Sequence, residues 1–350
     1  MTEVNLSGKH ILITGGAGFI GSHLVDRLLE RGAYVTALDN FVTGRRENLT
    51  LAMKNQNFRL VEADVSANWP KEKIEFLSQG LHGLFHFACP ASPVDFDRIP
   101  FEILAVDSIG TFRSVDLALE YGSRYLIAST SEVYGDPLVH PQTEDYFGNV
   151  NPIGPRACYD EAKRFGEALV STAIRGVGTW NGRADYGSRA NASGKKGLNG
   201  GIVRIFNTYG PRMRPDDGRV VPELCMQALQ EKPLTIHGDG MQTRSFCYVD
   251  DLVEGILRYF DSDLSAPTNI GNPSERTIRE FAEAVREQAR IDGFQEMPIQ
   301  SLPGRQDDPK KRCPDISVAR MKLGWEPKVG LTEGLSRTFK YFHSEMEKRN

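Results

Sequence analysis

Residues 9–40 read KHILITGGAGFIGSHLVDRLLERGAYVTALDN, and this stretch decides the fold. An apolar run at 10–14 leads into a glycine-rich turn, and apolar residues then recur at helical spacing over 20–31. A second apolar run, 34–39, ends on an aspartate. Strand, glycine turn, helix and strand in this order are typical of a parallel sheet whose strands are joined by crossover helices.

The same alternation continues through the first half of the chain. It predicts further strands at 58–64, 83–88, 124–130 and 201–207, and further helices at 101–121 and 159–174. Beyond about residue 210 the elements become shorter, and the loops are rich in Pro, Gly and Arg. We therefore predict an α/β fold: a Rossmann-type doubly wound parallel sheet, mainly residues 1–207, interleaved with a smaller C-terminal mixed α/β lobe, mainly 208–350.

The segment 175–201 interrupts this pattern. Gly, Asn, Ser and charged residues dominate it, and no apolar period is sustained, so we predict a flexible insertion. Two interpretations stay open. The segment is either a cationic lid near the site, through Arg183, Arg189, Lys195 or Lys196, or a surface excursion.

Composition narrows the class of protein. The chain has 350 residues, 40% of them apolar and 25% charged, and a net charge of -4. We expect neither an export signal nor a membrane span, and no nucleic-acid or membrane partner. The five cysteines are scattered and form no CxxC pair, which favours reduced thiols in the cytoplasm over a disulfide framework or a metal site.

The glycine turn predicts a dinucleotide site. Gly15, Gly18 and Gly21 allow backbone amides and the amino end of the helix to approach a pyrophosphate. Asp39, at the end of the second strand, is placed to bind an adenosine ribose, which favours NAD over a cofactor with a 2'-phosphate. Two arginines at 45–46 could still accommodate such a phosphate, and a ligand-free turn is the other alternative.

A second pattern predicts catalysis. Tyr159 and Lys163 are four residues apart and share one helix face, where the ammonium lowers the pKa of the phenol and makes it a usable base. Thr130, Ser131 and Glu132 follow the strand at 124–130, on the edge where doubly wound sheets bind ligands. Turn capping remains the alternative for the two hydroxyls, and a structural carboxylate for the glutamate.

These features resemble the extended short-chain dehydrogenases/reductases that act on nucleotide sugars, the NAD-dependent epimerase/dehydratase family, and most closely its UDP-glucuronate decarboxylases. The resemblance covers nearly the whole chain. It runs through GGAGFIGSHL, DNFVTG, STSEVYGDPLVHPQTEDYFGNVNPIGPRACYDEAKR, RIFNTYGPRM, DDGRVV, QTRSFCYVDDLVEGI, NIGNP and DDPKKRCPDI. Dehydratases of the superfamily carry an Asp where this chain has Ser131, which disfavours dehydration.

The resemblance implies a redox-neutral decarboxylation of UDP-glucuronate to UDP-xylose. Tyr159 takes the proton of the 4-hydroxyl, held by Thr130, while hydride passes to tightly bound NAD and later returns. The 4-keto sugar loses its carboxylate as carbon dioxide without a metal. Glu132 and Arg312 manage the carboxylate and the proton, and Ser131 completes the catalytic set. Relatives of this type are homodimers packed through the helix that carries Tyr159.

The resemblance also implies two sets of binding residues. Those expected around NAD are Gly15, Gly18, Phe19, Ile20, Gly21, Asp39, Asn40, Thr43, Gly44, Asp64, Val65, Ala88, Tyr159, Lys163 and Arg219. Those expected around the UDP-sugar are Asn207, Thr235, His237, Arg244 and Arg312. A helix cap is the alternative for Asp64, a solvated surface position for Arg219 and Arg244, and a structural role for His237.

Three departures from the family leave the identity of the substrate sugar undecided. Ala105 stands where relatives have a lysine that meets the substrate carboxylate, Asp107 stands where they have Asn, and the segment 175–201 replaces a short loop. A 4-epimerase and a decarboxylase that stops at the 4-keto sugar therefore remain alternatives. A non-catalytic NAD-binding protein is disfavoured because Tyr159 and Lys163 are both present.

Overall fold

The computed structural model describes residues 4–176, 197–304 and 310–348. Most of the predicted insertion, with its four cationic residues, and the first residues of DDPKKRCPDI lie outside the described residues. Seven parallel strands form the central sheet in the order β11-β6-β5-β4-β1-β2-β3. Their bounds are β1 His10–Thr14, β2 Tyr34–Asp39, β3 Phe58–Glu62, β4 Gly83–His86, β5 Arg124–Thr130, β6 Gly200–Ile205 and β11 Thr268–Ile270. The predicted doubly wound parallel sheet is confirmed.

Side chains of each strand alternate between two hydrophobic cores, as the pleat of a strand requires. In β1, Ile11 and Ile13 enter one core and Leu12 enters the other. In β4, Phe85 enters the first core and Leu84 enters the second. Both faces of the sheet are therefore buried, which explains why its strands read as continuous apolar runs rather than as alternating ones.

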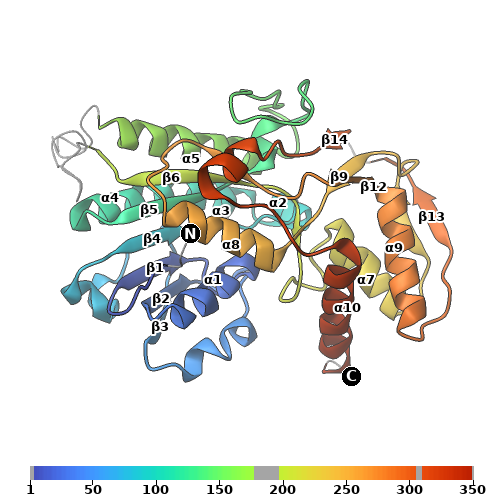
Figure 1. Cartoon of the computed structure of the whole chain (residues 1–350), viewed down its shortest axis with the longest axis horizontal. Coiled ribbons are helices and arrows are strands. Elements are labelled where there is room, and N and C mark those ends of the chain that lie inside the picture. Colours follow the sequence, from blue (N-terminus) through green and yellow to red (C-terminus); the bar gives the residue numbers. More distant parts are fainter. Residues whose placement is uncertain (1–3, 177–196, 305–309, 349–350) are drawn as a thin grey trace.

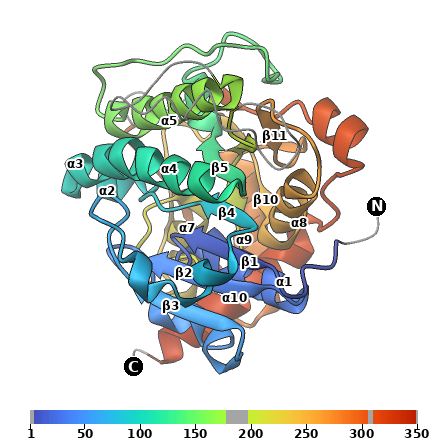
Figure 2. The same cartoon turned by 90° about the vertical axis from the view of Figure 1, so that its left-hand side faces the viewer.

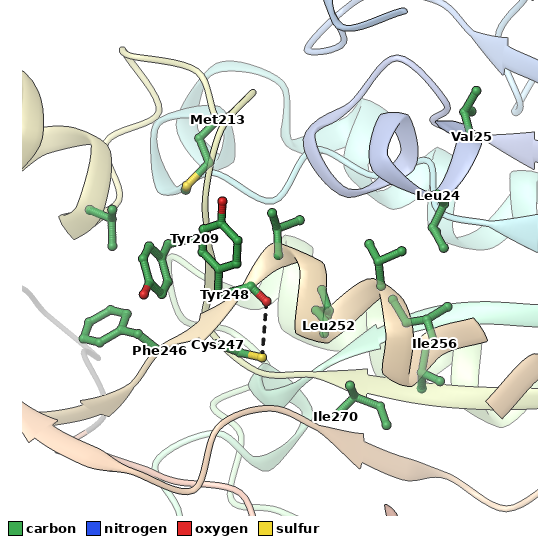
Figure 3. Close-up of a cluster of buried hydrophobic side chains, with 14 of the residues drawn as sticks. Leu24, Val25, Tyr209, Met213, Phe246, Cys247, Tyr248, Leu252, Ile256 and Ile270 are labelled. Atoms are coloured by element: carbon green, nitrogen blue, oxygen red, sulfur yellow. Dashed lines mark hydrogen bonds between the residues drawn. The ribbon is translucent and has the colours of Figure 1, made fainter. Parts of the chain in front are cut away.

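Helices cover the two faces. On one face, α1 (Phe19–Glu30) packs against α8 (Val249–Phe260), and Figure 3 shows their buried side chains, including Leu24 and Ile256, in one cluster. On the other face lie α3 (Pro100–Ala105), α4 (Thr111–Tyr121) and α5 (Ala157–Arg175), side by side in Figure 2. A short α2 (Pro93–Arg98) precedes α3.

The remaining elements form the smaller lobe, which lies beside the sheet on the right in Figure 1. Its helices are α7 Val220–Leu229, α9 Ile278–Ile291 and α10 Leu331–Glu347. Its short strands are β7 Thr208–Tyr209, β8 Leu234–His237, β9 Thr243–Ser245, β10 Cys247–Tyr248, β12 Glu275–Thr277, β13 Ile299–Leu302 and β14 Lys311–Arg312. The chain crosses between the two parts more than once, since α8 and β11 belong to the sheet layers.

One predicted element differs in an informative way. The single helix expected over 101–121 is divided, because a π-helical turn, Val106–Gly110, separates α3 from α4. Such turns are rare and insert an extra residue that rotates the side chains that follow. Here the turn carries Asp107, one of the departures from the family, into the core beside α5, where it is 1% exposed.

Candidate active site

The glycine turn forms a cradle for a ligand at the amino end of α1. Gly15 has a φ of 70°, and a Cβ there would lie 2.7 Å from the backbone of Ala88. Among the described residues no side chain caps the first turn of α1, which begins at Phe19. Its backbone N–H groups therefore point toward the space in front of Gly18, as an anionic ligand requires.

Asp39 lies next to this turn with its carboxylate engaged by the backbone. Its Oδ2 accepts the N–H of Ala17 and its Oδ1 that of Phe41, each at 2.9 Å. Burial raises the pKa of Asp39, against the effect of these hydrogen bonds. Arg45 pairs with Glu345, so this nearby cation already has a carboxylate partner.

Two other charged residues near the turn, Arg46 and Asp64, also interact with neighbouring side chains. Arg46 pairs with Glu62 and lies over the ring of Phe41, 4.2 Å from its centroid. Asp64 accepts hydrogen bonds from the backbone N–H and the hydroxyl of Ser66, at 2.7 and 2.6 Å. The carboxylate of Asp64 thus closes a local turn, and because no helix begins at Asp64, it is not the helix cap that was the alternative to an adenine contact.

A cavity of about 440 Å³ runs from the glycine turn along the carboxyl edge of the sheet into the smaller lobe. It brings together most of the predicted site. The predicted residues that line it are Gly15, Gly18, Phe19, Ile20, Gly21, Thr43, Thr130, Ser131, Glu132, Tyr159, Lys163, Asn207, Arg219, Thr235, His237, Arg244 and Arg312. Predicted cofactor residues that are not in its lining are Asp39, Asn40, Gly44, Asp64, Val65 and Ala88.

Tyr159 lines the cavity. Its ring stacks on Phe96, with centroids 5.2 Å apart and planes inclined by 19°. Burial raises the pKa of Tyr159, while Lys163, whose Nζ lies 5.7 Å from the ring centroid, and a hydrogen bond with Thr130 act to lower it. The hydroxyl at the end of β5 and the ammonium one turn along α5 both favour the phenolate, but burial outweighs them, so the pKa of Tyr159 lies above its usual value and not below it as the sequence predicted.

Lys163 is anchored from two sides. Its Nζ donates to the carbonyl oxygen of Ala128 at 3.1 Å and to Oδ1 of Asp107 at 2.9 Å. Burial would lower the pKa of Lys163, but Asp107 more than offsets this and raises it. Lys163 is accordingly a fixed cation and not a proton donor near neutral pH.

A second charge cluster borders Tyr159. Glu132 accepts a hydrogen bond from Arg156 at 2.7 Å and another from Arg312. Burial would raise the pKa of Glu132, but the two arginines hold it at about 2. Arg312 is 3% exposed, and its Nη2 has no hydrogen-bond partner in the described part of the chain. Asp160 lies behind this cluster, and burial together with Glu132 raises its pKa to about 7.

The smaller lobe contributes two arginines through strand register. In the parallel pair of β9 and β14, Arg244 lies opposite Arg312, so both side chains reach the cavity. Nη2 of Arg219 donates a hydrogen bond to Oδ2 of Asp217 at 2.8 Å. The hydroxyl of Thr235 is hydrogen-bonded to Gln227 at 2.7 Å, a structural contact.

Sequence reasoning missed several lining residues. Cys89, Phe96, Arg156, Arg212 and Arg214 all line the cavity. A signal existed only for Arg156, which precedes Tyr159 by three positions and so lies on the same helix face one turn earlier. Contacts of the others depend on how the loops after β4 and before α7 fold over the edge of the sheet.

Comparison with known proteins places this geometry in a family. The model of the NAD dependent epimerase/dehydratase family matches residues 11–271. The chain belongs to this family. It is 46% identical over 339 residues to UDP-glucuronic acid decarboxylase 1 of Danio rerio, which covers 97% of this chain and 74% of the relative.

Solved structures of the family are also similar to this chain in fold. UDP-glucose 4-epimerase of Thermotoga maritima with UDP-glucose superimposes with a TM-score of 0.80 at 31% identity, covering 96% of this chain and 99% of that one. UDP-glucuronic acid 4-epimerase of Bacillus cereus, in complex with UDP-glucuronic acid and NAD, gives 0.79 at 27% identity, with the same two coverages of 96% and 99%.

The cofactor of the family, NAD, fits the residues present. The cradle at Gly15 has no room for a side chain, and the amino end of α1 faces it. Arg45 and Arg46 are paired with carboxylates, which leaves the second loop without a ready partner for a 2'-phosphate. Elsewhere in the described ranges, no three metal-ligating side chains gather at one point, and no helix is long and apolar enough to cross a membrane.

The pKa of Asp160 predicts a pH-dependent stability. Because it is raised to about 7, folding favours the protonated acid, and the stabilisation present at low pH is lost as pH rises through about 7. Asp160→Asn removes this titration. We expect the variant to be more stable than the parent by about 1–3 kcal/mol at pH 8, with the difference vanishing near pH 3.

Chemical denaturation at a series of pH values measures this difference. Glu161→Gln, which neutralises a more exposed carboxylate on the same helix, is the matched control and retains the pH dependence that comes from Asp160, although loss of this neighbouring charge lowers the pKa of Asp160 somewhat. A constant difference between Asp160→Asn and the parent across the pH range contradicts the assignment.

Proposed function

We propose that the chain catalyses the NAD-dependent decarboxylation of UDP-glucuronate to UDP-xylose through a 4-keto sugar. The observation that carries this proposal is the ionised Glu132 held between Arg156 and Arg312 beside Tyr159. Such a cluster offers a carboxylate-binding surface next to a base. The similarity to decarboxylases over nearly the whole chain supports the same assignment.

Tyr159 removes the proton of the sugar 4-hydroxyl in this proposal. Thr130 orients that hydroxyl, and Lys163 stabilises the phenolate. NAD, when bound, accepts the hydride of C4 and returns it at the end of the cycle. Ser131, buried at 2% exposure and lining the cavity, completes the polar end of β5 and supplies no acid for the elimination of water.

The substrate carboxylate binds to Arg156 and Arg312 in this proposal. Guanidinium groups bind carboxylates through paired N–H donors, and Nη2 of Arg312 is available for this contact. Both arginines then take the role of the lysine that relatives have at the position of Ala105. The side chain at position 105 is not in the cavity lining, so this position makes no contact of its own there.

Glu132 has a narrower role than the sequence suggested. With a pKa of about 2 it carries no proton near neutral pH, so it is not the acid that protonates C5. We assign it to orienting the two arginines, and the C5 proton to water. The enolate left by carbon dioxide is stabilised by protonated Tyr159 and by Lys163 behind it.

The nucleotide end of the substrate extends into the smaller lobe. Asn207 and Arg244 line that part of the cavity and are proposed to bind the diphosphate, with Thr235 and His237 beside the base. Arg219 lies between Asp217 and Tyr159 and is proposed to contact the cofactor. Asp39, Asn40, Gly44, Asp64, Val65 and Ala88 stay proposals for the adenosine end, although the cavity lining does not include them.

The direct test is turnover of UDP-glucuronate by the purified protein. We expect release of carbon dioxide and formation of UDP-xylose with no net change in NAD, and Tyr159→Phe lowers kcat by about 100-fold or more. Coupled detection of carbon dioxide and chromatography of the nucleotide sugars measure this. UDP-galacturonate without carbon dioxide identifies a 4-epimerase instead, and accumulation of the 4-keto pentose identifies an enzyme that stops early.

Arg156→Gln tests the carboxylate site. Loss of a charged hydrogen bond costs about 1.5–3 kcal/mol, so we expect KM for UDP-glucuronate to rise by about 10- to 100-fold. Binding of UDP-xylose, which has no carboxylate, stays within about twofold. Calorimetric titration with both nucleotides separates the two effects. Arg175→Gln, at the far end of α5, is the control, and equal losses for both ligands contradict the role of Arg156.

We also propose a homodimer in the cytoplasm. The outer faces of α3 and α5, neighbours in Figure 2, expose large apolar side chains: Phe101 at 80%, Leu104 at 40% and Phe165 at 43%. Covering such a patch is favourable. All five cysteines are free thiols, as a reducing compartment favours.

Light scattering during size exclusion tests the dimer. We expect the parent to elute as a dimer and Phe165→Glu to shift toward monomer, because a buried charge without a partner is costly. Met321→Glu, at a side chain that is 74% exposed on a different part of the molecule, leaves the dimer intact. A parent that is monomeric at micromolar concentration contradicts the proposal.

A further inference from the structure

A buried carboxylate lies directly behind the proposed base. Asp107 is 1% exposed, and its Oδ1 accepts a hydrogen bond from Nζ of Lys163 at 2.9 Å. Its Oδ2 accepts one from Sγ of Cys89, also at 2.9 Å. Burial and the proximity of Asp107 raise the pKa of Cys89 well above its usual range, so the thiol stays protonated and acts as the donor.

The backbone fixes this carboxylate in place. Asp107 belongs to the π-helical turn Val106–Gly110, and its carbonyl oxygen accepts the hydroxyl of Thr111 at 2.7 Å. π-Turns recur at functional sites because they redirect one side chain without ending the helix. The ion pair is therefore a built contact within the packed layer between α4 and α5, and not a chance encounter of flexible side chains.

The ion pair changes what Lys163 does for Tyr159. A single ammonium close to the phenol favours the phenolate. A carboxylate 2.9 Å from the same ammonium opposes this, because the pair together carries no net charge. Tyr159 thus faces a dipole whose positive end is nearer, rather than an isolated cation.

The other charged groups around this pair have partners of their own. Glu132 faces Tyr159 from the end of β5 but is bound by two arginines, and Arg219 faces it from the loop before α7 but is bound by Asp217. His86 faces Lys163 from β4, and burial with Lys163 lowers its pKa to about 3, so it is neutral. Tyr125 of β5 is buried near both ions, and its pKa is raised.

We propose that Asp107 is a positioning residue that partly cancels the charge of Lys163 at Tyr159, so that proton abstraction begins at a higher pH than a neutral side chain at position 107 allows. The inference rests on the proposed role of Tyr159 as the base. It does not depend on which sugar is the substrate. Asp107 is not itself part of the cavity lining, and it acts through Lys163, whose ammonium it contacts.

The test is Asp107→Asn, which keeps the size of the side chain and removes its charge. In the NAD-loaded enzyme, we expect the rising limb of kcat/KM against pH to move down by about one unit. At a fixed pH below the limb, kcat/KM then increases about tenfold. A limb that stays in place or moves up overturns the proposal.

A second readout needs no turnover. Ultraviolet difference titration of tyrosinate in the NAD-loaded protein, with Tyr159→Phe as the reference, follows the ionisation of this one phenol. We expect Asp107→Asn to ionise Tyr159 at a lower pH than the parent. If no sugar is turned over but the titration shifts down, the proposed function fails and the role of Asp107 stands. If turnover occurs and neither profile shifts, the proposed function stands and the role of Asp107 fails.

Controls separate this effect from general loss of a buried ion pair. Asp261→Asn breaks the pair of Arg31 and Asp261, which lies 2.5 Å apart at the far end of α1, with side chains that are 5% and 15% exposed. It is expected to lower stability without moving either pH profile. If Asp107→Asn does not fold, the smaller uncharged Asp107→Ser is expected to shift both profiles in the same downward direction, and no shift in that variant overturns the proposal.

Discussion

The site depends on how closely helix α5 packs on strand β5. A Cβ at Gly166 would lie 3.0 Å from Cδ1 of Ile127, so a larger residue would require the isoleucine to shift, and glycine favours this close approach. Lys163, one turn earlier, therefore reaches the carbonyl oxygen of Ala128 on the same strand. Tyr159, a further turn earlier, meets Thr130 where β5 ends. One helix face and one strand register thus align the base, its cation and the orienting hydroxyl.

Charges in the interior of this edge occur in opposite pairs, because a buried charge without a partner is costly. Lys163 pairs with Asp107, and Arg204 with Glu167 at 2.8 Å. Some buried polar atoms in the described residues still have no hydrogen-bond partner, among them Nη2 of Arg312, Oδ1 of Asp160, Nη1 of Arg212 and Nε of Arg124. The first two belong to the cluster around Glu132. Two of these atoms therefore lie where the proposed substrate carboxylate binds.

Local patterns in the sequence were enough to predict the strands of the central sheet except β11, and to place Tyr159 and Lys163 on one helix face. Apolar strands and a glycine turn are properties of consecutive residues, and Tyr159 and Lys163 share a face because helical geometry fixes their spacing. The π-helical turn at Asp107 could not be predicted in this way, since an uninterrupted helix satisfies the same apolar period. The turn coincides with a tertiary contact, because Asp107 within it pairs with Lys163 on α5.

The same distinction explains the cofactor end and the arginine cluster. Asp39 was correctly placed at the end of its strand, but its contacts with Ala17 and Phe41 depend on how the turn folds back. Arg156 and Arg312 both bind Glu132 although they are far apart in sequence, and β14, which carries Arg312, pairs with β9. Contacts made by pairing of distant segments leave no periodic signal.

The two charge clusters divide the proposed reaction between them. Lys163 and Asp107 control the proton of Tyr159 from behind, while Glu132 holds Arg156 and Arg312 toward the carboxylate from the side. When that carboxylate leaves as neutral carbon dioxide, the two arginines lose a buried anionic partner. Glu132 still binds both of them, since its ionisation does not depend on the substrate. The cavity can therefore bind an anionic sugar and release a product with one charge fewer without leaving either guanidinium buried and unpaired.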